Sequence, residues 1–226
     1  MSLALVPSRA LLGLDAPAVT VEVHLANGLP GFTLVGLADT EVKEARERVR
    51  SALQNSGLEF PANKRITVNL APADLPKDSG RFDLPIALGI LAASGQVPAA
   101  ALHNHVFAGE LSLSGSLRPV RGALAMAAAL QQQGDAAPLV LPQGSAEEAA
   151  LVPGVRVYRA AHLLDVVRHF LPAGQDTPPG RNTLEALQPS ACLPDPVYPD
   201  MADVKGQAGA RRALDICAAG GHSLLI

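Results

Sequence analysis

Short runs in which apolar residues alternate with polar ones, or in which β-branched residues dominate, recur along much of the chain. Such runs are typical of β-strands, because successive side chains of a strand point to opposite faces of its sheet. The predicted strands are Val19–Leu25, Phe32–Gly36, Arg65–Leu70, Val106–Leu113, Leu139–Pro142 and Val155–Tyr158.

Apolar residues at helical spacing lie between these strands. One helix is predicted to begin near Asp39 or Thr40, which are favourable capping residues, and to end before Gly57. Val49 and Leu53 would lie on its apolar face. A second helix, at 83–94, is apolar nearly all round, so it should be buried. Further helices are predicted at 122–133, 145–151 and 160–171.

The order of these elements indicates how the chain is divided into domains. Strands that alternate with helices over residues 1–171 predict one α/β (α+β) domain. Pro and other turn-forming residues dominate residues 172–199, where hydrophobic periodicity disappears, so this segment is predicted to be an extended linker. Residues 200–226 add a helical pattern and an apolar strand, His222–Ile226.

Composition narrows the function classes. The chain of 226 residues is 48% hydrophobic and only 3% aromatic, so its core must be largely aliphatic. A formal net charge of −3 argues against a free-standing nucleic-acid binder, which is usually strongly basic, but it leaves room for a local basic patch. The sequence shows neither a signal-peptide pattern nor an apolar run of about 18 residues. We therefore expect a soluble, cytoplasmic protein with no membrane partner.

Residues 69–88 hold the densest set of reactive side chains: a strand, a loop rich in polar residues, Gly and Pro, and the start of the buried helix. The N-terminus of a helix favours an anion or a nucleophile, because its backbone N–H groups are unpaired and carry partial positive charge. Asp83 stands at that start, and the simplest interpretation is that its carboxylate caps the helix.

Two segments resemble the proteolytic domain of Lon-type proteases. The loop before Asp83 resembles the Lon loop that presents a catalytic Ser at the start of a helix, and Gly109–Gly122 resembles the segment that precedes the catalytic Lys. The resemblance places Asp83 at the Ser position and Leu124 at the Lys position. Because a serine nucleophile needs a base close by, this pairing implies a Lon-like fold without the catalytic dyad. An active peptidase that uses Ser79 with Lys77 remains the alternative.

Over its whole length the chain resembles the ComM/YifB family of magnesium-chelatase-like AAA+ ATPases of bacteria. The matching strings are Val21–Val23, Gly28–Leu37, Glu44–Arg50, Thr67–Leu75 and Gly109–Leu113. The resemblance implies a Lon-protease-like, ribosomal-protein-type two-layer N-terminal domain, joined to an ATPase domain that forms hexameric rings. It also implies ATP and Mg²⁺ as cofactors of the full-length protein, and a role in DNA branch migration during natural transformation.

Residues 200–226 resemble the opening of that ATPase domain. Val204, Gly206 and Gln207 would lie in the segment that contacts the adenine in AAA+ domains. The phosphate-binding loop G-x-x-x-x-G-K-[ST] would follow, but the sequence ends at Ile226, so we expect a truncated domain. Without that loop and its Mg²⁺ ligands, we expect no cofactor and no phosphoryl transfer in this fragment.

Basic residues concentrate on one predicted helix. Glu and Arg interleave along residues 44–50, at spacings that favour ion pairs on a solvated helix face. The alternative is a contact with DNA or with a neighbouring subunit. The basic candidates for such a contact are Lys43, Arg46, Arg50, Arg118 and Arg121.

The histidines do not predict a metal site. His103 and His105 would share a face if they lay on a strand. No Cys and no nearby carboxylate completes a ligand set, however, so a surface loop is the favoured interpretation.

We therefore expect a non-proteolytic binding and assembly domain of a ComM-like ATPase. The full-length protein would be a homo-hexameric, ATP-driven motor acting on branched or single-stranded DNA, and ATP hydrolysis would belong to that longer form. Besides the active peptidase, the remaining alternative is a chelatase-like ATPase subunit that remodels another protein.

Overall fold

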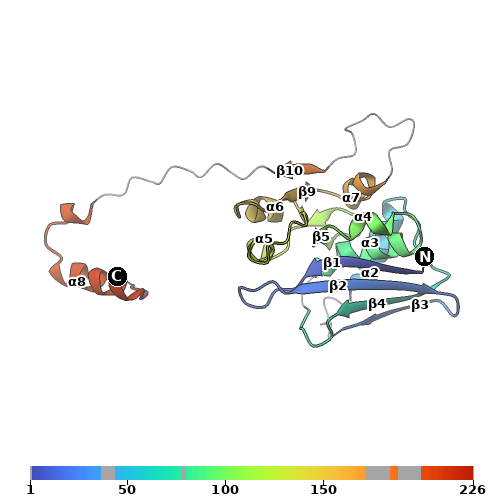
Figure 1. Ribbon diagram of the computed structural model, residues 1–226, viewed down its shortest axis with the longest axis horizontal. Helices are drawn as coiled ribbons and strands as arrows, with labels where there is room; N and C mark the ends of the chain where they lie inside the picture. The colour runs from blue at the N-terminus through green and yellow to red at the C-terminus, as the bar shows by residue number, and fades with distance from the viewer. Residues whose placement is uncertain (1, 37–43, 78–79, 172–183, 188–199, 226) are drawn as a thin grey trace. The chain divides into compact units, whose positions relative to one another are not determined.

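The structure is a computed structural model, and it describes residues 2–36, 44–77, 80–171, 184–187 and 200–225 (Figure 1). The chain divides into two compact units, Met1–Ser190 and Ala191–Ile226. Within the described ranges, every strand belongs to the first unit.

The first sheet is built from strands with regular alternation of apolar and polar residues. It consists of β1 (Leu3–Arg9), β2 (Ala18–Ala26), β4 (Arg65–Ala71) and β3 (Gly31–Val35), in that order. Strand β2 runs antiparallel to both of its neighbours, β1 and β4, whereas β3 is parallel to β4. Burial alternates along β1, β2 and β4, so one face of the sheet is turned to the core.

Two helices cover the core side of this sheet. Helix α3 (Asp83–Ala93) packs against β1 and β2, and all of its residues are buried, as its all-round apolar pattern predicts (Figure 1). Helix α2 (Ala45–Asn55) packs beside α3 and buries Val49 and Leu53. The larger of the two hydrophobic clusters among the described residues contains α3, and the other lies around α5 (Ala123–Gln132) and α6 (Ser145–Ala149).

A second, smaller sheet follows in the chain. Its strands are, in order, β10 (Glu185–Leu187), β9 (Val157–Ala160), β8 (Leu139–Pro142) and β5 (Val106–Phe107). Strands β5, β8 and β9 are parallel, and β10 is antiparallel to β9. The other elements of this unit are η1 (Gly80–Phe82), α4 (Ala99–Leu102), β6 (Glu110–Leu111), β7 (Leu117–Arg118), α5 (Ala123–Gln132), α6 (Ser145–Ala149) and α7 (Leu163–Phe170).

Because helices and strands are mixed along the first unit, the predicted α/β class is confirmed.

The structure moves several predicted boundaries. The strand predicted at 106–113 is two short strands, β5 and β6, and β9 extends to Ala160, so the next helix begins at Leu163. Strands β1 and β10 are absent from the prediction, and β10 lies within the segment expected to be a linker. Strand β10 forms by pairing with β9, which lies well before it in the sequence, whereas β1 pairs with β2, the next strand along the chain. The predicted helix start at Asp39 or Thr40 lies outside the described residues.

The second unit contains η2 (Met201–Asp203) and α8 (Ala208–Gly220). Residues 222–225 adopt no regular structure, so the strand predicted at His222–Ile226 does not form over these residues. Helix α8, with 13 residues, is the longest helix of the described ranges, and none of these helices is long and apolar enough to cross a membrane.

Gly89 allows α3 to approach the first sheet closely. A Cβ atom at this position would lie 2.5 Å from Cγ2 and 3.2 Å from Cβ of Val23. We expect Gly89→Ala to lower the free energy of unfolding by about 1–3 kcal/mol, because overpacking outweighs the roughly 1 kcal/mol by which Ala is favoured over Gly in a helix. Urea unfolding of the purified variant measures the loss.

Val23→Ala provides the control for this contact. Removing the γ-methyl groups makes room for the new Cβ, so the double variant should be more stable than the sum of the two single losses indicates. Strictly additive losses would show that the contact with Val23 is not the cause.

Candidate functional site

Asp83, at the position where the Lon resemblance places a catalytic Ser, is enclosed by protein. Its side chain is fully buried at the start of α3. Oδ2 accepts hydrogen bonds from Nε of Arg48 at 2.6 Å and from the backbone N–H of Leu111 at 3.1 Å, and Oδ1 accepts one from Nη2 of Arg48 at 3.1 Å. The described start of α3 has no side-chain capping bond, so the prediction that Asp83 caps this helix is wrong.

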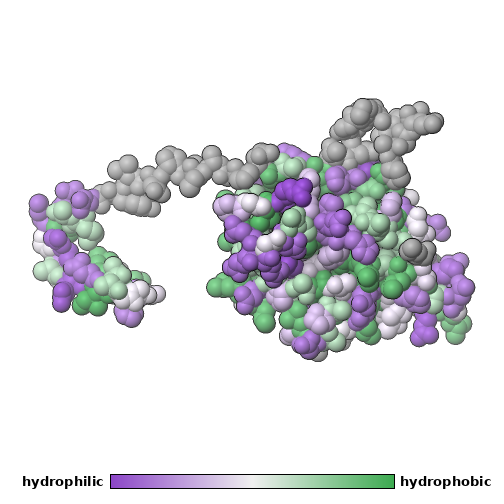
Figure 2. Space-filling model, in the orientation of Figure 1, coloured by the Kyte–Doolittle hydropathy of each residue, from purple (hydrophilic) through white to green (hydrophobic). Residues whose placement is uncertain are grey.

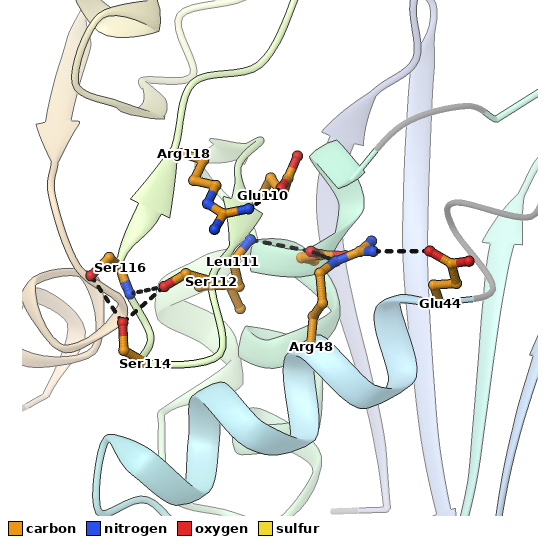
Figure 3. Close-up of polar contacts among 9 residues, drawn as sticks. Glu44, Arg48, Glu110, Leu111, Ser112, Ser114, Ser116 and Arg118 are labelled. Atoms are coloured by element: carbon orange, nitrogen blue, oxygen red, sulfur yellow. Dashed lines mark hydrogen bonds and ion pairs between the residues drawn. The ribbon is translucent and has the colours of Figure 1, made fainter.

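Arg48 belongs to the helix face that its spacing predicts to be solvated, yet its side chain points from α2 toward the start of α3 (Figure 3). The side chain is only 20% exposed. Glu44, one turn earlier, lies 3.8 Å from Nη1 of Arg48, so one predicted i,i+4 pair is present. The prediction of a fully solvated face is wrong at this position, because Asp83, 35 residues further along the chain, binds the guanidinium.

Burial and pairing act in opposite directions on the pKa of Asp83. Removal from water disfavours the charged carboxylate and raises the pKa to about 6, although Arg48 and the N–H of Leu111 lower it. The hydrogen bond to Asp83 is also the main reason that the pKa of Arg48 is raised. The hydrogen bonds of Asp83 to Arg48 and Leu111 join α2, α3 and β6. They do not fully offset the free-energy cost of burying the carboxylate charge.

The other residues of the Lon comparison contribute no described nucleophile–base pair. Lys77 is buried, its ammonium group donates to the carbonyl of Pro72, and burial lowers its pKa. Leu124, at the Lys position, is 44% exposed, and its backbone N–H donates to Glu148. Ser79 lies outside the described residues, so its pairing with Lys77 stays a prediction.

Two of the basic candidates meet in a groove of the first unit. Arg46 and Arg50, one turn apart on α2, line it together with Lys64. Phe32 of β3 and Phe60 form part of its wall, and the guanidinium carbon of Arg50 lies 5.7 Å from the centroid of the Phe60 ring. This distance is within the range of a cation–π contact. We call the hollow lined by these five residues the basic groove. Its volume is about 130 Å³.

The positive charge of the basic groove is only partly offset by its surroundings. Within the part of the chain that the structure describes, no carboxylate lines the groove. Nε of Arg46 lies 3.3 Å from Oε1 of Glu47, in an exposed pair, and the ammonium group of Lys64 donates to Oδ1 of Asn27 at 2.7 Å. The spacing of Arg46 and Arg50 is visible in the sequence, but the approach of Lys64 and the aromatic rings is not.

Arg118 and Arg121 lie apart from the basic groove. Nη1 of Arg118 lies 3.2 Å from Oε1 of Glu110 (Figure 3), and Arg121 is exposed. Neither residue lines the groove. Lys43 lies outside the described residues. The structure thus brings two of the five candidates together.

His103 and His105 differ in their exposure to solvent. His103 is exposed, as predicted. His105 also lies in the loop before β5, as predicted, but it is half-buried, with its ring centroid 4.8 Å from that of Phe170 and 6.3 Å from that of His169. Burial lowers the pKa of His105. Among the described residues, no group of three or more His, Cys, Asp or Glu side chains is placed to hold a metal ion.

The candidates for adenine contact lie between η2 and α8. Gly206 and Gln207 have φ angles of 76° and 52°, so the chain turns sharply just before α8. The carbonyl of Val204 accepts a hydrogen bond from Nη1 of Arg211 at 3.5 Å. Every residue from 200 to 225 is exposed or half-buried, so the role of these three residues in adenine contact stays a prediction.

Comparison with known proteins gives matches along the whole chain. The profile of the family described as subunit ChlI of Mg-chelatase matches residues 21–145, and that of magnesium chelatase, subunit ChlI, matches residues 200–226. Competence protein ComM of Haemophilus influenzae is 51% identical over 239 aligned residues, which cover 100% of this chain and 43% of the relative.

Similar coverage is found in other bacteria. The YifB protein of Escherichia coli is 47% identical, over 100% of this chain and 42% of its own length. A protein of Mycobacterium tuberculosis is 39% identical, over 97% of this chain and 42% of its own. The chain therefore spans less than half the length of these relatives.

Removal of the Asp83 charge should change how stability depends on pH. The pKa of Asp83 is about 6 in the folded protein and about 4 in an unfolded chain, so the unfolded state loses its proton first as the pH rises. The contribution of Asp83 to stability is therefore largest below about pH 4 and falls by roughly 3 kcal/mol as the pH rises through 6. The difference in unfolding free energy between wild type and Asp83→Asn should shrink accordingly, as measured by urea unfolding across this range.

Asp15→Asn, which removes an exposed carboxylate, is the matched control for this measurement. A difference between wild type and Asp83→Asn that grows with pH would contradict the expectation. It would mean that Arg48 lowers the pKa of Asp83 below its ordinary value and that pairing outweighs burial.

Proposed function

Because the chain belongs to the magnesium-chelatase-like family that includes ComM and YifB, we propose that its first unit is a non-proteolytic binding and assembly domain that contacts DNA. The whole protein is, in this proposal, a hexameric, ATP-driven motor that moves DNA branches during transformation and recombination. The name of the Haemophilus influenzae relative, a competence protein, supports the connection with DNA uptake.

The non-proteolytic role is supported by the surroundings of Asp83. Both carboxylate oxygens accept hydrogen bonds from Arg48 or Leu111, and the side chain is fully buried, so it does not face a substrate. At the other position of the Lon comparison, the aliphatic side chain of Leu124 has no group that can accept a proton from a nucleophile. A structural role in joining α2, α3 and β6 accounts for Asp83.

The observation that carries the DNA contact is the basic groove. The net charge of the chain is −3, and hydrophilic and hydrophobic residues intermix on the visible face of the first unit (Figure 2), so an attraction for phosphate must be local. Arg46, Arg50 and Lys64 supply local positive charge with no carboxylate among the described lining residues. Contacts of this kind bind DNA through its phosphates and are weakened by salt.

The Asp83–Arg48 contact also supports the geometry of the groove. Residues 46 and 50 are four apart and share one face of α2, whereas residue 48 projects from a different face. Arg48 is tied to α3 through Asp83, and Arg46 and Arg50 line the groove. One face of α2 thus fixes the helix, and another is presented for binding.

We expect the 226-residue chain to shift branched and single-stranded DNA in gel electrophoresis, with an affinity that falls as salt rises. If the cations of the groove each contact one phosphate, the logarithm of the binding constant should fall against the logarithm of salt with a slope of about −2 to −3. The same chain should not hydrolyse ATP, and a serine-reactive probe should not label it.

The predictions on DNA binding, ATP hydrolysis and probe labelling can each be contradicted separately. DNA binding that is absent, or that salt leaves unchanged, would contradict the DNA contact and favour assembly alone. ATP hydrolysis by this chain would contradict the assignment of that reaction to the longer protein. Covalent labelling of Ser79 by the probe would contradict the non-proteolytic role.

A further inference from the structure

We infer that the basic groove continues into a second hollow, and that the two together hold nucleic acid in single-stranded form. This inference rests on the proposed DNA contact, and it adds the form of the ligand and the groups that bind each part of a nucleotide. Lys64 and Pro61 line both hollows, so the two share a wall.

The two hollows differ in charge. Arg46 and Arg50 line only the first, whereas the second, of about 670 Å³, carries Lys64 and Glu59 as its charged side chains. The other polar residues of the second hollow are Ser2, His24, Asn27, Asn63, Ser94 and Gln96. A strongly cationic part followed by one rich in amides and hydroxyls matches a nucleotide, which joins an anionic phosphate to a neutral sugar and a base with hydrogen-bonding edges.

Besides the positive charge, the groove contains aromatic rings, which favour a ligand with flat rings that can stack on them. The guanidinium of Arg50 lies over the ring of Phe60, and Phe32 lies in the same wall. Stacking of bases on aromatic rings and on arginine planes, inside a positive groove, is the usual means of binding single strands without sequence preference. An acidic peptide would neutralise the cations but would make no use of this stacking surface.

The concave shape favours one strand over a duplex. The cationic part is a hollow of about 130 Å³ that adjoins the larger one of about 670 Å³. Proteins read duplex DNA with helices or strands that project into its grooves. The cations of the groove, of which Arg46 is exposed, line a hollow and not a projecting element, so they contact the backbone of a flexible single strand more readily than that of a stiff duplex.

Hydrogen bonds hold the wall of the second hollow in place. Oε1 of Gln96 accepts from the backbone N–H of Glu59 at 3.0 Å, and Nε2 of Gln96 donates to the carbonyl of Glu59 and to Oγ of Ser94, each at 2.8 Å. Lys64 is oriented by Asn27 at 2.7 Å. Because these side chains are already ordered, less conformational entropy is lost when a strand binds.

The test compares two double variants of the 226-residue chain by fluorescence anisotropy with a labelled oligothymidine of about 12 nucleotides. Arg46→Ala/Arg50→Ala should weaken single-strand binding by roughly tenfold or more and make the salt slope shallower by about 1.4, the value for two lost phosphate contacts. Arg118→Ala/Arg121→Ala removes the same charge outside the groove and should change the affinity much less. A duplex of equal length should bind wild type more weakly than the single strand.

Phe60→Leu separates stacking from charge. It keeps an apolar side chain in the wall but removes the ring, so single-strand affinity should fall several-fold while the salt slope stays the same. Thermal unfolding checks that each variant is folded, and Arg46→Gln/Arg50→Gln provides a second charge-removing pair with long polar side chains.

The contrary results are distinct. Equal losses in the two arginine pairs, or duplex binding as tight as single-strand binding, would overturn the inference. A change of oligomeric state with DNA binding intact would overturn it too, and would assign the groove to an acidic surface of a second copy. Wild type that binds no DNA would refute the proposed function as well. DNA binding that the groove variants leave unchanged would refute the inference and the groove as the site of contact, but not a DNA contact elsewhere on the first unit.

Discussion

A buried carboxylate needs partners, and this requirement ties together three elements of the first unit. Asp83 begins a helix whose residues are all buried, so its charge cannot reach water. Leaving such a charge unpaired costs several kcal/mol, and Arg48 with the N–H of Leu111 offsets much of this penalty. The three groups come from α2, α3 and β6. One polar contact therefore links two helices to β6, which pairs antiparallel with β7.

This contact also bears on both proposals for the first unit, its lack of proteolysis and its contact with nucleic acid. The position that the Lon resemblance assigns to a nucleophile holds a fully buried acceptor, so it serves packing. Its partner Arg48 orients α2, and two further arginines of the same helix line the groove with Lys64. In our proposal, a helix that is fixed on one face by a buried ion pair presents another face to nucleic acid.

Local sequence pattern predicted the elements whose own residues show a clear periodicity of apolar and polar positions. Strands β2 and β4 alternate clearly, and the all-round apolar run of α3 indicated a buried helix. The pattern was insufficient where structure depends on a distant partner. Strand β10 exists by pairing with β9, and His105 is half-buried because Phe170 of a later helix packs against it. Arg48 was expected in solvent because its helical neighbours are charged, and nothing within its own segment indicates Asp83.

The sequence by itself determined the α/β class, the buried helix α3, the absence of a Ser–Lys pair at the two Lon positions, and the strings shared with the ComM/YifB family. Only the tertiary structure decided which charges are buried and which converge. The parallel pairing of β3 with β4 places Gly31 opposite Arg65, and with it brings Phe32 and Lys64 to one groove beside α2. Periodicity states which face of an element avoids water, but it carries no information about which distant group will lie against that face.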